Sequence, residues 1–356
     1  MYRYLAIGLI TITCLLVIGI GVAWAPIFPL AKQLTVMPPA DSLPETPAIT
    51  ATTLIFGGDV MLSRNVGQKM AKYQDWSWPF ANIAGLLADA DLAIINLESP
   101  FTIGGSHLVK TGSFSFNADP QALEGLTQAG IDVVALANNH VLNQGKKGIA
   151  DTQKLLTANG IAFAGAGLNE TQARQPAIKE VNGLKFGFLS YAYPDDYSVA
   201  GTSTAGLAGM DIKKMASDVN RLKTEVNIVV ILMHAGIEYT NKPNGQQIAF
   251  AHAAVDAGAD MVIGHHPHWV QTAEIYNGKP ILYSLGNLIF DQMWSLQTQQ
   301  GALAEVTLTD KQINSIRIIP IKIIDYGQAT LATGTDKELT LNRMGLNDEI
   351  ININNQ

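Results

Sequence analysis

Cysteine is almost absent from this chain of 356 residues, and its single copy, Cys14, lies in an uncharged stretch near the N-terminus. The remainder of the chain therefore forms no disulfide and no thiolate zinc site, and it offers no cysteine nucleophile. Charged residues make up only 15%, and 23 basic against 30 acidic residues give a net charge of -7. Basic stretches with interleaved aromatic residues are missing too, so we expect no nucleic-acid partner.

Hydrophobic residues are plentiful, at 47% of the chain, which is enough for the core of one enzyme-sized domain with appendages. The first appendage is residues 1–30, in which the run from Leu5 to Ala25 carries no charged side chain. A helix of this length, with a rise of about 1.5 Å per residue, crosses about 30 Å of hydrocarbon. We predict an uncleaved membrane anchor; the alternative is a cleavable signal peptide with a cleavage site at Ala23-Trp24-Ala25.

Two basic residues flank the uncharged run, Arg3 before it and Lys32 after it. This arrangement slightly favours a cytoplasmic N-terminus and a main domain on the outer side. Residues 31–51 are rich in proline and poor in large apolar side chains, which indicates an extended linker. We therefore expect a single-pass protein of the cell membrane whose extracytoplasmic body begins near Thr52.

The body, residues 52–325, alternates β-rich apolar runs with helical segments. The expected strands are residues 53–56, 92–95, 133–136, 161–164, 184–190, 228–233, 261–263 and 281–284. The expected helices are residues 120–129, 146–159, 211–224 and 245–258. This alternation predicts an α/β fold whose ligands gather at the carboxyl ends of the strands. Residues 302–308 and 313–324 predict a hairpin, and residues 326–356 form a polar C-terminal tail without a motif.

Imidazole side chains concentrate directly after the apolar run 261–263. The sequence Gly264-His265-His266-Pro267-His268 holds three of the seven histidines. In an extended segment every second side chain points the same way, so His266 and His268 are expected to face one metal or two adjacent metals. His265 then faces away, which suggests a structural or substrate-facing role.

Other ligand-type side chains also follow strand-like runs, namely Asp59, Glu98, Asn139 and His234. Taken alone, each has an ordinary structural explanation, such as a turn or helix cap for Asp59 and a packed histidine for His234. A carboxylate after four apolar residues, as at Glu98, is costly to leave unpaired. Their shared position at strand ends predicts one common site.

His140 follows Asn139 directly and is a candidate acid or base; a solvated histidine in an Asn-rich turn is the alternative. Glu238, four residues after His234, is a candidate for the hydrogen bond that fixes the ring tautomer of His234. Carboxylate, amide and imidazole ligands without sulfur suit Mn, Fe or Zn, and two such ions side by side are typical of hydrolytic enzymes.

The order of these motifs resembles the calcineurin-like metallophosphatase superfamily and, within it, the capsule and poly-γ-glutamate biosynthesis proteins of CapA (PgsA) type. The resemblance extends from about Thr52 to Asp291. Six linked motifs carry it: Gly-Asp-Val-Met-Leu, Asn-Leu-Glu-Ser-Pro, Ala-Asn-Asn-His, His-Ala-Gly-Ile-Glu-Tyr, Gly-His-His-Pro-His and Tyr-Ser-Leu-Gly-Asn-Leu-Ile-Phe-Asp-Gln.

The resemblance implies a four-layered αββα sandwich with a cleft for one or two divalent metal ions. It implies that His140 protonates the leaving oxygen and that Asn287, in the last motif, supports a ligand or contacts the substrate. The metal ligands that it implies are Asp59, Glu98, Asn139, His234, His266 and His268. Two positions depart from the superfamily pattern: Met61 stands in place of a histidine, and Glu98 in place of an aspartate.

Asn143 and Ala235 also stand where the subfamily has aspartate and tryptophan. These departures leave three hypotheses. The first is a membrane-anchored component that makes, exports or anchors a capsule polymer such as poly-γ-glutamate. The second is a stand-alone metal-dependent phosphoesterase acting on a cell-surface phosphoester, and the third is an inactive binding subunit, favoured by Met61 and opposed by His140.

The partners follow from what the chain lacks. It has no Gly-x-x-x-x-Gly-Lys-Ser/Thr loop for ATP, so any polymer synthase or ligase must be a separate protein, accompanied by small membrane subunits. The expected substrate is an anionic polymer or a phosphoester.

Overall fold

The computed structural model describes residues 51–104, 107, 110, 112–193 and 198–353. The predicted anchor (residues 1–30) and nearly all of the predicted linker (residues 31–51) lie outside this range. Within the described residues, no helix has both the length and the apolar character that crossing a bilayer requires.

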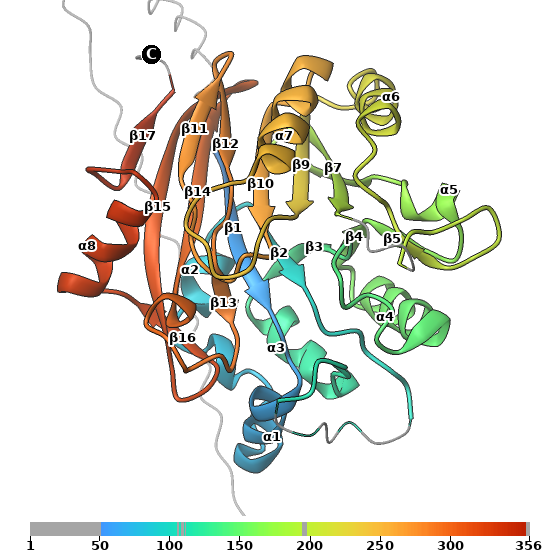
Figure 1. Cartoon of the computed structure of the whole chain (residues 1–356), viewed down its shortest axis with the longest axis vertical. Coiled ribbons are helices and arrows are strands. Elements are labelled where there is room, and N and C mark those ends of the chain that lie inside the picture. Colours follow the sequence, from blue (N-terminus) through green and yellow to red (C-terminus); the bar gives the residue numbers. More distant parts are fainter. Residues whose placement is uncertain (1–50, 105–106, 108–109, 111, 194–197, 354–356) are drawn as a thin grey trace, which may run out of the picture. The chain divides into compact units, whose positions relative to one another are not determined.

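Two mixed sheets form the body (Figure 1). The first has nine strands in the order β16-β15-β14-β1-β2-β3-β4, with β13 beside β1 and β17 beside β15. The pairs β1–β2, β2–β3, β3–β4 and β1–β13 are parallel, whereas β14 to β17 run antiparallel to their neighbours. The strands are β1 (Ala51–Val60), β2 (Leu92–Leu97), β3 (Ile131–Ala135), β4 (Ala162–Ala164), β13 (Asn287–Ile289), β14 (Gln300–Thr309), β15 (Gln312–Ile324), β16 (Gln328–Leu331) and β17 (Ile350–Asn352).

The second sheet has six strands in the order β11-β12-β10-β9-β7-β6. Its four central strands are parallel, and an antiparallel strand closes each edge. These strands are β6 (Ala177–Val181), β7 (Leu184–Ala192), β9 (Ile228–His234), β10 (Met261–His265), β11 (Ala273–Tyr276) and β12 (Lys279–Leu282). A short ladder of β5 (Ala166–Gly167) and β8 (Gly206–Leu207) lies apart from both sheets.

Helices cover the outer face of each sheet. The first sheet carries α1 (Arg64–Tyr73), α2 (Ala84–Ala88), α3 (Leu123–Gln128) and α4 (Gly145–Ala158), and the second carries α6 (Ile212–Leu222) and α7 (Gly245–Ala257). The remaining helices are α5 (Glu170–Ala173), α8 (Gly334–Arg343) and the 3-10 turns Trp78–Phe80, Pro120–Ala122 and Gln297–Gln299.

Side-chain alternation along the strands explains these layers. In β1, Leu54 and Phe56 pack between the two sheets, whereas Ile55 faces the helices. In β9, Val230 points inward and Ile231 points towards α6 and α7. Three apolar cores thus lie between four layers, in the order helices, first sheet, second sheet, helices. This mixed α/β architecture agrees with the predicted fold class and is consistent with a metallophosphatase-like sandwich.

The predicted hairpin forms as β14 and β15, but the C-terminal segment is more than a polar tail. Residues 328–352 contribute β16, α8 and β17, and Leu341, Met344 and Ile351 enter the core between the sheets. These few apolar residues are separated by polar ones, so composition alone does not reveal them. The body therefore extends beyond residue 325 within the described residues.

Candidate metal centre

Asp59 lies at the end of β1, where the chain passes very close to a neighbouring backbone. Gly58 is required there because a Cβ would stand 1.9 Å from the carbonyl oxygen of Gly286. The carboxylate of Asp59 is fully buried. Its Oδ1 accepts a hydrogen bond from Nδ2 of Asn96 (2.7 Å), and its Oδ2 accepts one from the backbone N–H of His266 (3.2 Å).

Glu98 follows β2 and is also fully buried. Its Oε2 has no hydrogen-bond partner within the described residues, and its Oε1 lies 3.5 Å from Nδ2 of Asn96 and 3.8 Å from Nε2 of His234. Burial, followed by the negative charge of Asp59, raises the pKa of Glu98 well above its ordinary value. A buried carboxylate oxygen without a partner is costly unless a proton or a cation occupies the space beside it.

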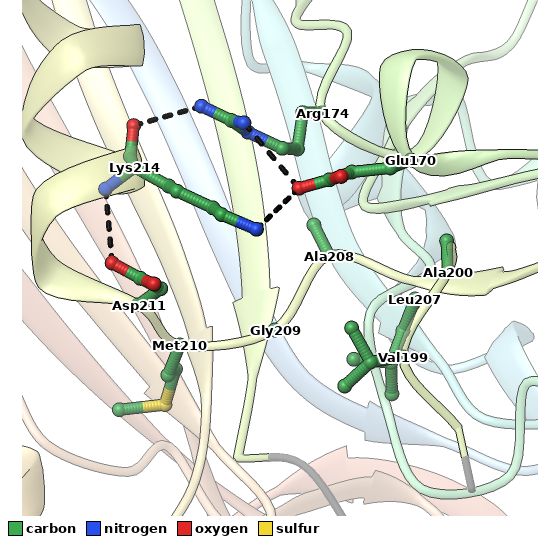
Figure 2. A pocket seen from close by; sticks show the side chains of 10 residues that line it. All are labelled: Glu170, Arg174, Val199, Ala200, Leu207, Ala208, Gly209, Met210, Asp211 and Lys214. Carbon is green, nitrogen blue, oxygen red and sulfur yellow. Dashed lines mark hydrogen bonds and ion pairs between the residues drawn. The ribbon is translucent and has the colours of Figure 1, made fainter. Parts of the chain in front are cut away.

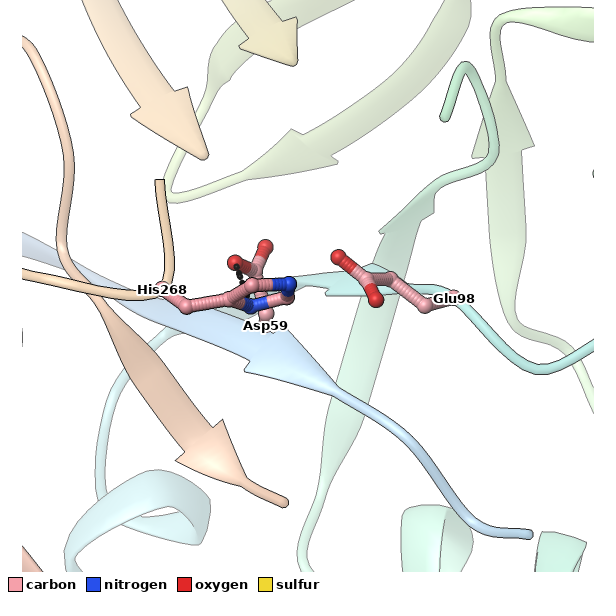
Figure 3. Close-up of side chains that lie close together, drawn as sticks. All are labelled: Asp59, Glu98 and His268. Carbon is pink, nitrogen blue, oxygen red and sulfur yellow. Dashed lines mark ion pairs between the residues drawn. The ribbon is translucent and has the colours of Figure 1, made fainter. Parts of the chain in front are cut away.

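His268 completes a first group of ligand atoms with these two carboxylates, all within 4.8 Å of one another (Figure 3). Its Nδ1 lies 2.9 Å from Oδ1 of Asn287 and 3.4 Å from Oδ2 of Asp59. An Nδ1–H that donates to Asn287 leaves the lone pair of Nε2 available to a metal. Asn287 occupies the place beside Asp59 in the β1–β13 pair, so the strand pairing positions the ring.

The pKa values of His268 and Asp59 are shifted in opposite directions. Burial alone lowers the pKa of His268, but the hydrogen bond with Asp59 and the charge of Glu98 outweigh it and raise the pKa to about 9. Burial alone raises the pKa of Asp59, yet His268 and the other nearby histidines hold it below its ordinary value. Without a metal ion, His268 therefore supplies the positive charge that the two carboxylates need.

Asn139, His234 and His266 form a second group next to the first. Nε2 of His234 lies 3.1 Å from Oδ1 of Asn139 and 3.1 Å from Nδ1 of His266. Burial lowers the pKa of both imidazoles, to about 4 for His266. Neutral imidazole and amide oxygen are ligands for a transition metal. Glu98, 3.8 Å from His234, lies between the two groups.

The segment His266-Pro267-His268 is not extended, contrary to the prediction. His266 has φ 99° and His268 has φ 57°, values that are uncommon for residues with a side chain. The two imidazoles therefore join different groups, with ring centroids 6.2 Å apart. Strain of this kind persists where surrounding contacts hold it, which is typical of functional sites.

His140 directly follows Asn139 of the second group, is buried, and is not itself one of the candidate ligands. Its ring stacks on Phe116 at a centroid distance of 4.0 Å, and its Nδ1 lies 2.9 Å from Oδ1 of Asn143. Asn143 thus receives the Nδ1–H and leaves Nε2 as the reactive nitrogen. Burial lowers the pKa of His140 to about 4, so the ring is neutral at pH 7.

His265 and Glu238 lie outside the two ligand groups. His265 is buried at the end of β10, and its Nε2 lies 3.2 Å from the carbonyl oxygen of Gly57 in the other sheet. Glu238 is exposed in the turn after β9. Glu238 therefore does not take the role predicted for it; the side chain that contacts Nδ1 of His234 is Asn96, whose Nδ2 lies 3.2 Å away.

Asn96 is the site residue that sequence reasoning missed. It is fully buried in β2, and its amide contacts Asp59, Glu98 and His234. Its Oδ1 accepts a hydrogen bond from Nδ2 of Asn138 (3.3 Å). The available signal was its spacing: residues i and i+2 of a strand share a face, so Asn96 points to the same side as Glu98.

Comparison with known proteins fits this geometry. Residues 53–292 match the family described as "Bacterial capsule synthesis protein PGA_cap". The chain belongs to this family. The capsule biosynthesis protein CapA of Bacillus anthracis is 30% identical over 80% of this chain and 71% of its own length. The PGA biosynthesis protein CapA of Bacillus subtilis (strain 168) is 29% identical over 81% and 76%, respectively.

A probable polyglutamine synthesis accessory protein of Mycobacterium tuberculosis is 31% identical over 66% of this chain and 65% of its own length. The resemblance that the six motifs predict, to capsule proteins of CapA type, is therefore confirmed. This PGA_cap chain keeps the predicted ligands together but places Met61 in the core, fully buried, with its sulfur 3.1 Å from the backbone nitrogen of Ser63. A thioether is a soft, uncharged donor, so Met61 is a poor replacement for the expected histidine in the first group.

Proposed function

We propose that this protein is a membrane-anchored, extracytoplasmic accessory component in the synthesis, export or anchoring of an acidic capsule polymer such as poly-γ-glutamate, and that its metal centre hydrolyses a phosphoester. The names of the two Bacillus relatives support the capsule role, and the name of the Mycobacterium tuberculosis relative supports an accessory role in polymer synthesis. The uncharged run from Leu5 to Ala25 supports the anchor. The enzymatic part rests on the chemistry of the site.

The observation that carries the enzymatic part is the position of Glu98. Its Oε2 is buried without a partner in the described chain, its side chain shares the first group with Asp59 and His268, and its Oε1 lies 3.8 Å from His234 of the second group. A divalent cation satisfies this carboxylate and the adjacent Asp59 better than a single protonated histidine does. The donor set therefore fits one or two ions of Mn, Fe or Zn.

Six side chains would hold the ions, Asp59, Glu98 and His268 on one side and Asn139, His234 and His266 on the other. Bound there, divalent ions would stabilise the negative charge that develops on a phosphoryl group. The protein positions these side chains through Asn96 and Asn287, which contact the ligands but do not belong to the set.

His140 is suited to moving the proton. In the proposed reaction, Nε2 of His140, having taken up a proton from solvent, gives it to the oxygen of the leaving group as the bond from that oxygen to phosphorus breaks; the water that attacks phosphorus from the opposite side releases its proton to solvent. Asn143 holds Nδ1 at 2.9 Å and so keeps Nε2 directed to this task. Stacking on Phe116 limits rotation of the ring.

A second candidate is a binding subunit without turnover. The buried Met61 favours it, because the first group has only Asp59, Glu98 and His268 as ligands. In either case, the absence of an ATP-binding loop from the sequence makes the polymer synthase or ligase a separate partner. Small membrane subunits complete the proposed assembly.

The variant His140→Ala separates the two candidates. For an enzyme, the substitution lowers phosphoesterase turnover by roughly two to four orders of magnitude while the metal stays bound. Purified protein is assayed on phosphomonoesters and diesters with Mn, Fe or Zn supplied, and cells carrying the variant are scored for polymer. Loss of polymer in cells, combined with no turnover by the wild-type protein, identifies a binding subunit.

A further inference from the structure

A second feature of the molecule is a pocket of about 480 Å³ that opens beside the metal centre. Its walls include Arg64, Asp291, Gln292, Tyr239, Trp294 and Phe114. Tyr239 stacks on His268 at a centroid distance of 6.0 Å, so only one ring separates the pocket from the first ligand group. None of these six residues has a role in the proposed chemistry.

Arg64 is the cation of this pocket, and the fold holds it firmly. It begins α1 with φ 47°, and it is only 7% exposed. The guanidinium pairs with the carboxylate of Asp291, and NH1 donates to the carbonyl oxygen of Ser113 (3.2 Å). Its Nε is buried without a partner within the described residues. A rigid, partly satisfied guanidinium is well suited to recognise a carboxylate.

Aromatic rings connect Arg64 to the reactive side chains. Its Cζ lies 5.0 Å from the ring centroid of Phe116 and 5.5 Å from that of Phe290. Phe116 stacks on His140, and Phe290 meets His268 edge-on at 4.8 Å. An anion bound by Arg64 is therefore held one ring away from both histidines.

The rim of the pocket is apolar and open. Trp294 is 60% exposed and Phe114 is 79% exposed, and Trp294 contacts Tyr239 edge-on at 4.7 Å. Large aromatic side chains exposed together at the mouth of a pocket commonly mark a binding site. Tyr326, also in the wall, has Lys69 over its ring at 5.8 Å, which places a second cation near the outer edge.

We infer that this pocket binds a segment of an acidic chain, with one carboxylate on Arg64 and the methylene groups between carboxylates packed against Trp294 and Tyr239. Arg64 and Asp291 together leave the wall without a large net charge, which suits isolated carboxylates and disfavours the denser charge of a phosphate polymer. A bare phosphate would also leave the exposed rings without a contact. The inference rests on the proposed function only in taking the neighbouring centre as the place where the chain is processed.

A second pocket, of about 460 Å³, provides the control (Figure 2). There Lys214 donates to Oε1 of Glu170 at 2.6 Å, and Arg174 is held by Asp218. Its wall contains no aromatic residue. Lys214→Gln therefore removes one positive charge, as Arg64→Gln does, from a pocket of similar size without the aromatic rim.

The test is calorimetric titration of the full chain with a synthetic oligomer of γ-linked glutamate. We expect Arg64→Gln and Trp294→Ala each to raise the Kd about tenfold or more, and Lys214→Gln to leave it unchanged. Arg64→Lys keeps the charge without the planar fork and gives an intermediate Kd. Because Trp294 is mostly exposed, Trp294→Ala remains informative even if Arg64→Gln does not fold.

Two outcomes would contradict the inference that this pocket binds an acidic chain. One is an unchanged Kd in folded Arg64→Gln and Trp294→Ala, and the other is a neutral oligosaccharide or polyphosphate that binds more tightly than the glutamate oligomer. A further variant, His266→Ala, separates this inference from the proposed function. If His266→Ala still binds the oligomer and no form of the protein hydrolyses a phosphoester, the enzymatic proposal is contradicted and the inferred binding site is supported. If the wild-type protein hydrolyses a phosphoester but does not bind the oligomer, only the inferred binding site is contradicted.

Discussion

Asn96 donates a hydrogen bond to Asp59 at 2.7 Å, and the same amide nitrogen lies 3.2 Å from Nδ1 of His234. One side chain of β2 thus orients a carboxylate from the first sheet and an imidazole from the second. We expect a residue in this position to control the geometry of the proposed ligands without itself being a ligand.

The first prediction concerns this contact. Asn96→Ala removes the hydrogen bond that orients Asp59 and the contact with Nδ1 of His234. We expect metal affinity to fall by about 10–100-fold, the usual loss when an outer-shell partner is removed. Competition with a chelator measures the affinity, and Asn220→Ala on the exposed face of α6 is the control. Equal affinities in the two variants would show that Asn96 does not position the ligands.

The second prediction concerns the close approach at Gly58. A Cβ there would lie 1.9 Å from Gly286, whereas one at Gly85 meets nothing within 4 Å. We expect Gly58→Ala to lower the free energy of unfolding by about 1–3 kcal/mol or more. Gly85→Ala, in α2, is expected to change it by less than about 1 kcal/mol, towards stability. Urea denaturation compares the two, and similar losses would contradict the close contact.

The third prediction concerns the C-terminal segment. Asp336, in the first turn of α8, accepts a hydrogen bond from Lys322 of β15 at 2.6 Å, which is the main reason that its pKa is lowered. A lowered carboxyl pKa gives stability that is complete above the ordinary value of 3.8 and is lost as the pH falls through the folded-state pKa.

Asp336→Asn should therefore reduce the free energy of unfolding at pH 7 by about 0.2–1 kcal/mol, as expected for a partly exposed pair. The difference from the wild-type protein should begin to shrink at pH 3, below the ordinary value of 3.8, because the unfolded wild-type chain takes up a proton there more readily than the folded one does. Urea denaturation at both pH values measures it. A difference independent of pH would mean that the charge of Asp336 does not hold α8 against β15.

The fourth prediction concerns the proposed anchor, residues 1–30. If the run from Leu5 to Ala25 crosses the bilayer, the full chain stays in the membrane fraction through alkaline carbonate washing. Protease added outside spheroplasts should digest the body. Release by carbonate contradicts the anchor, and a protected body in intact spheroplasts contradicts the orientation.

The sequence predicts much of the fold because apolar runs and helical segments are strong local signals. The helices expected at 146–159 and 245–258 are observed as Gly145–Ala158 and Gly245–Ala257. The candidate ligands could be predicted from the sequence for the same reason, since each follows a buried strand. The segment after residue 325 was missed because its contribution to the core, including Leu341 and Met344, is spread among polar residues.

Other parts of the site depend on tertiary contacts that no local pattern contains. The division of His266 and His268 between two groups follows from their positive φ angles, not from strand alternation. Arg64 and Asp291 are far apart in the chain and meet only because α1 and the segment after β13 lie together. Asn96 is inconspicuous in sequence, since its role depends on a histidine contributed by the other sheet.

The central claim is that the side chains around Glu98 hold a divalent metal ion, and the metal content of two histidine variants tests it most directly. His266 belongs to the second ligand group, whereas His252, on α7, stacks on Tyr276 and pairs with Glu274 outside both groups. After equal metal loading and dialysis, His252→Ala should keep the ion at the wild-type level and His266→Ala should lose it. Equal metal content in the two variants would contradict the assignment.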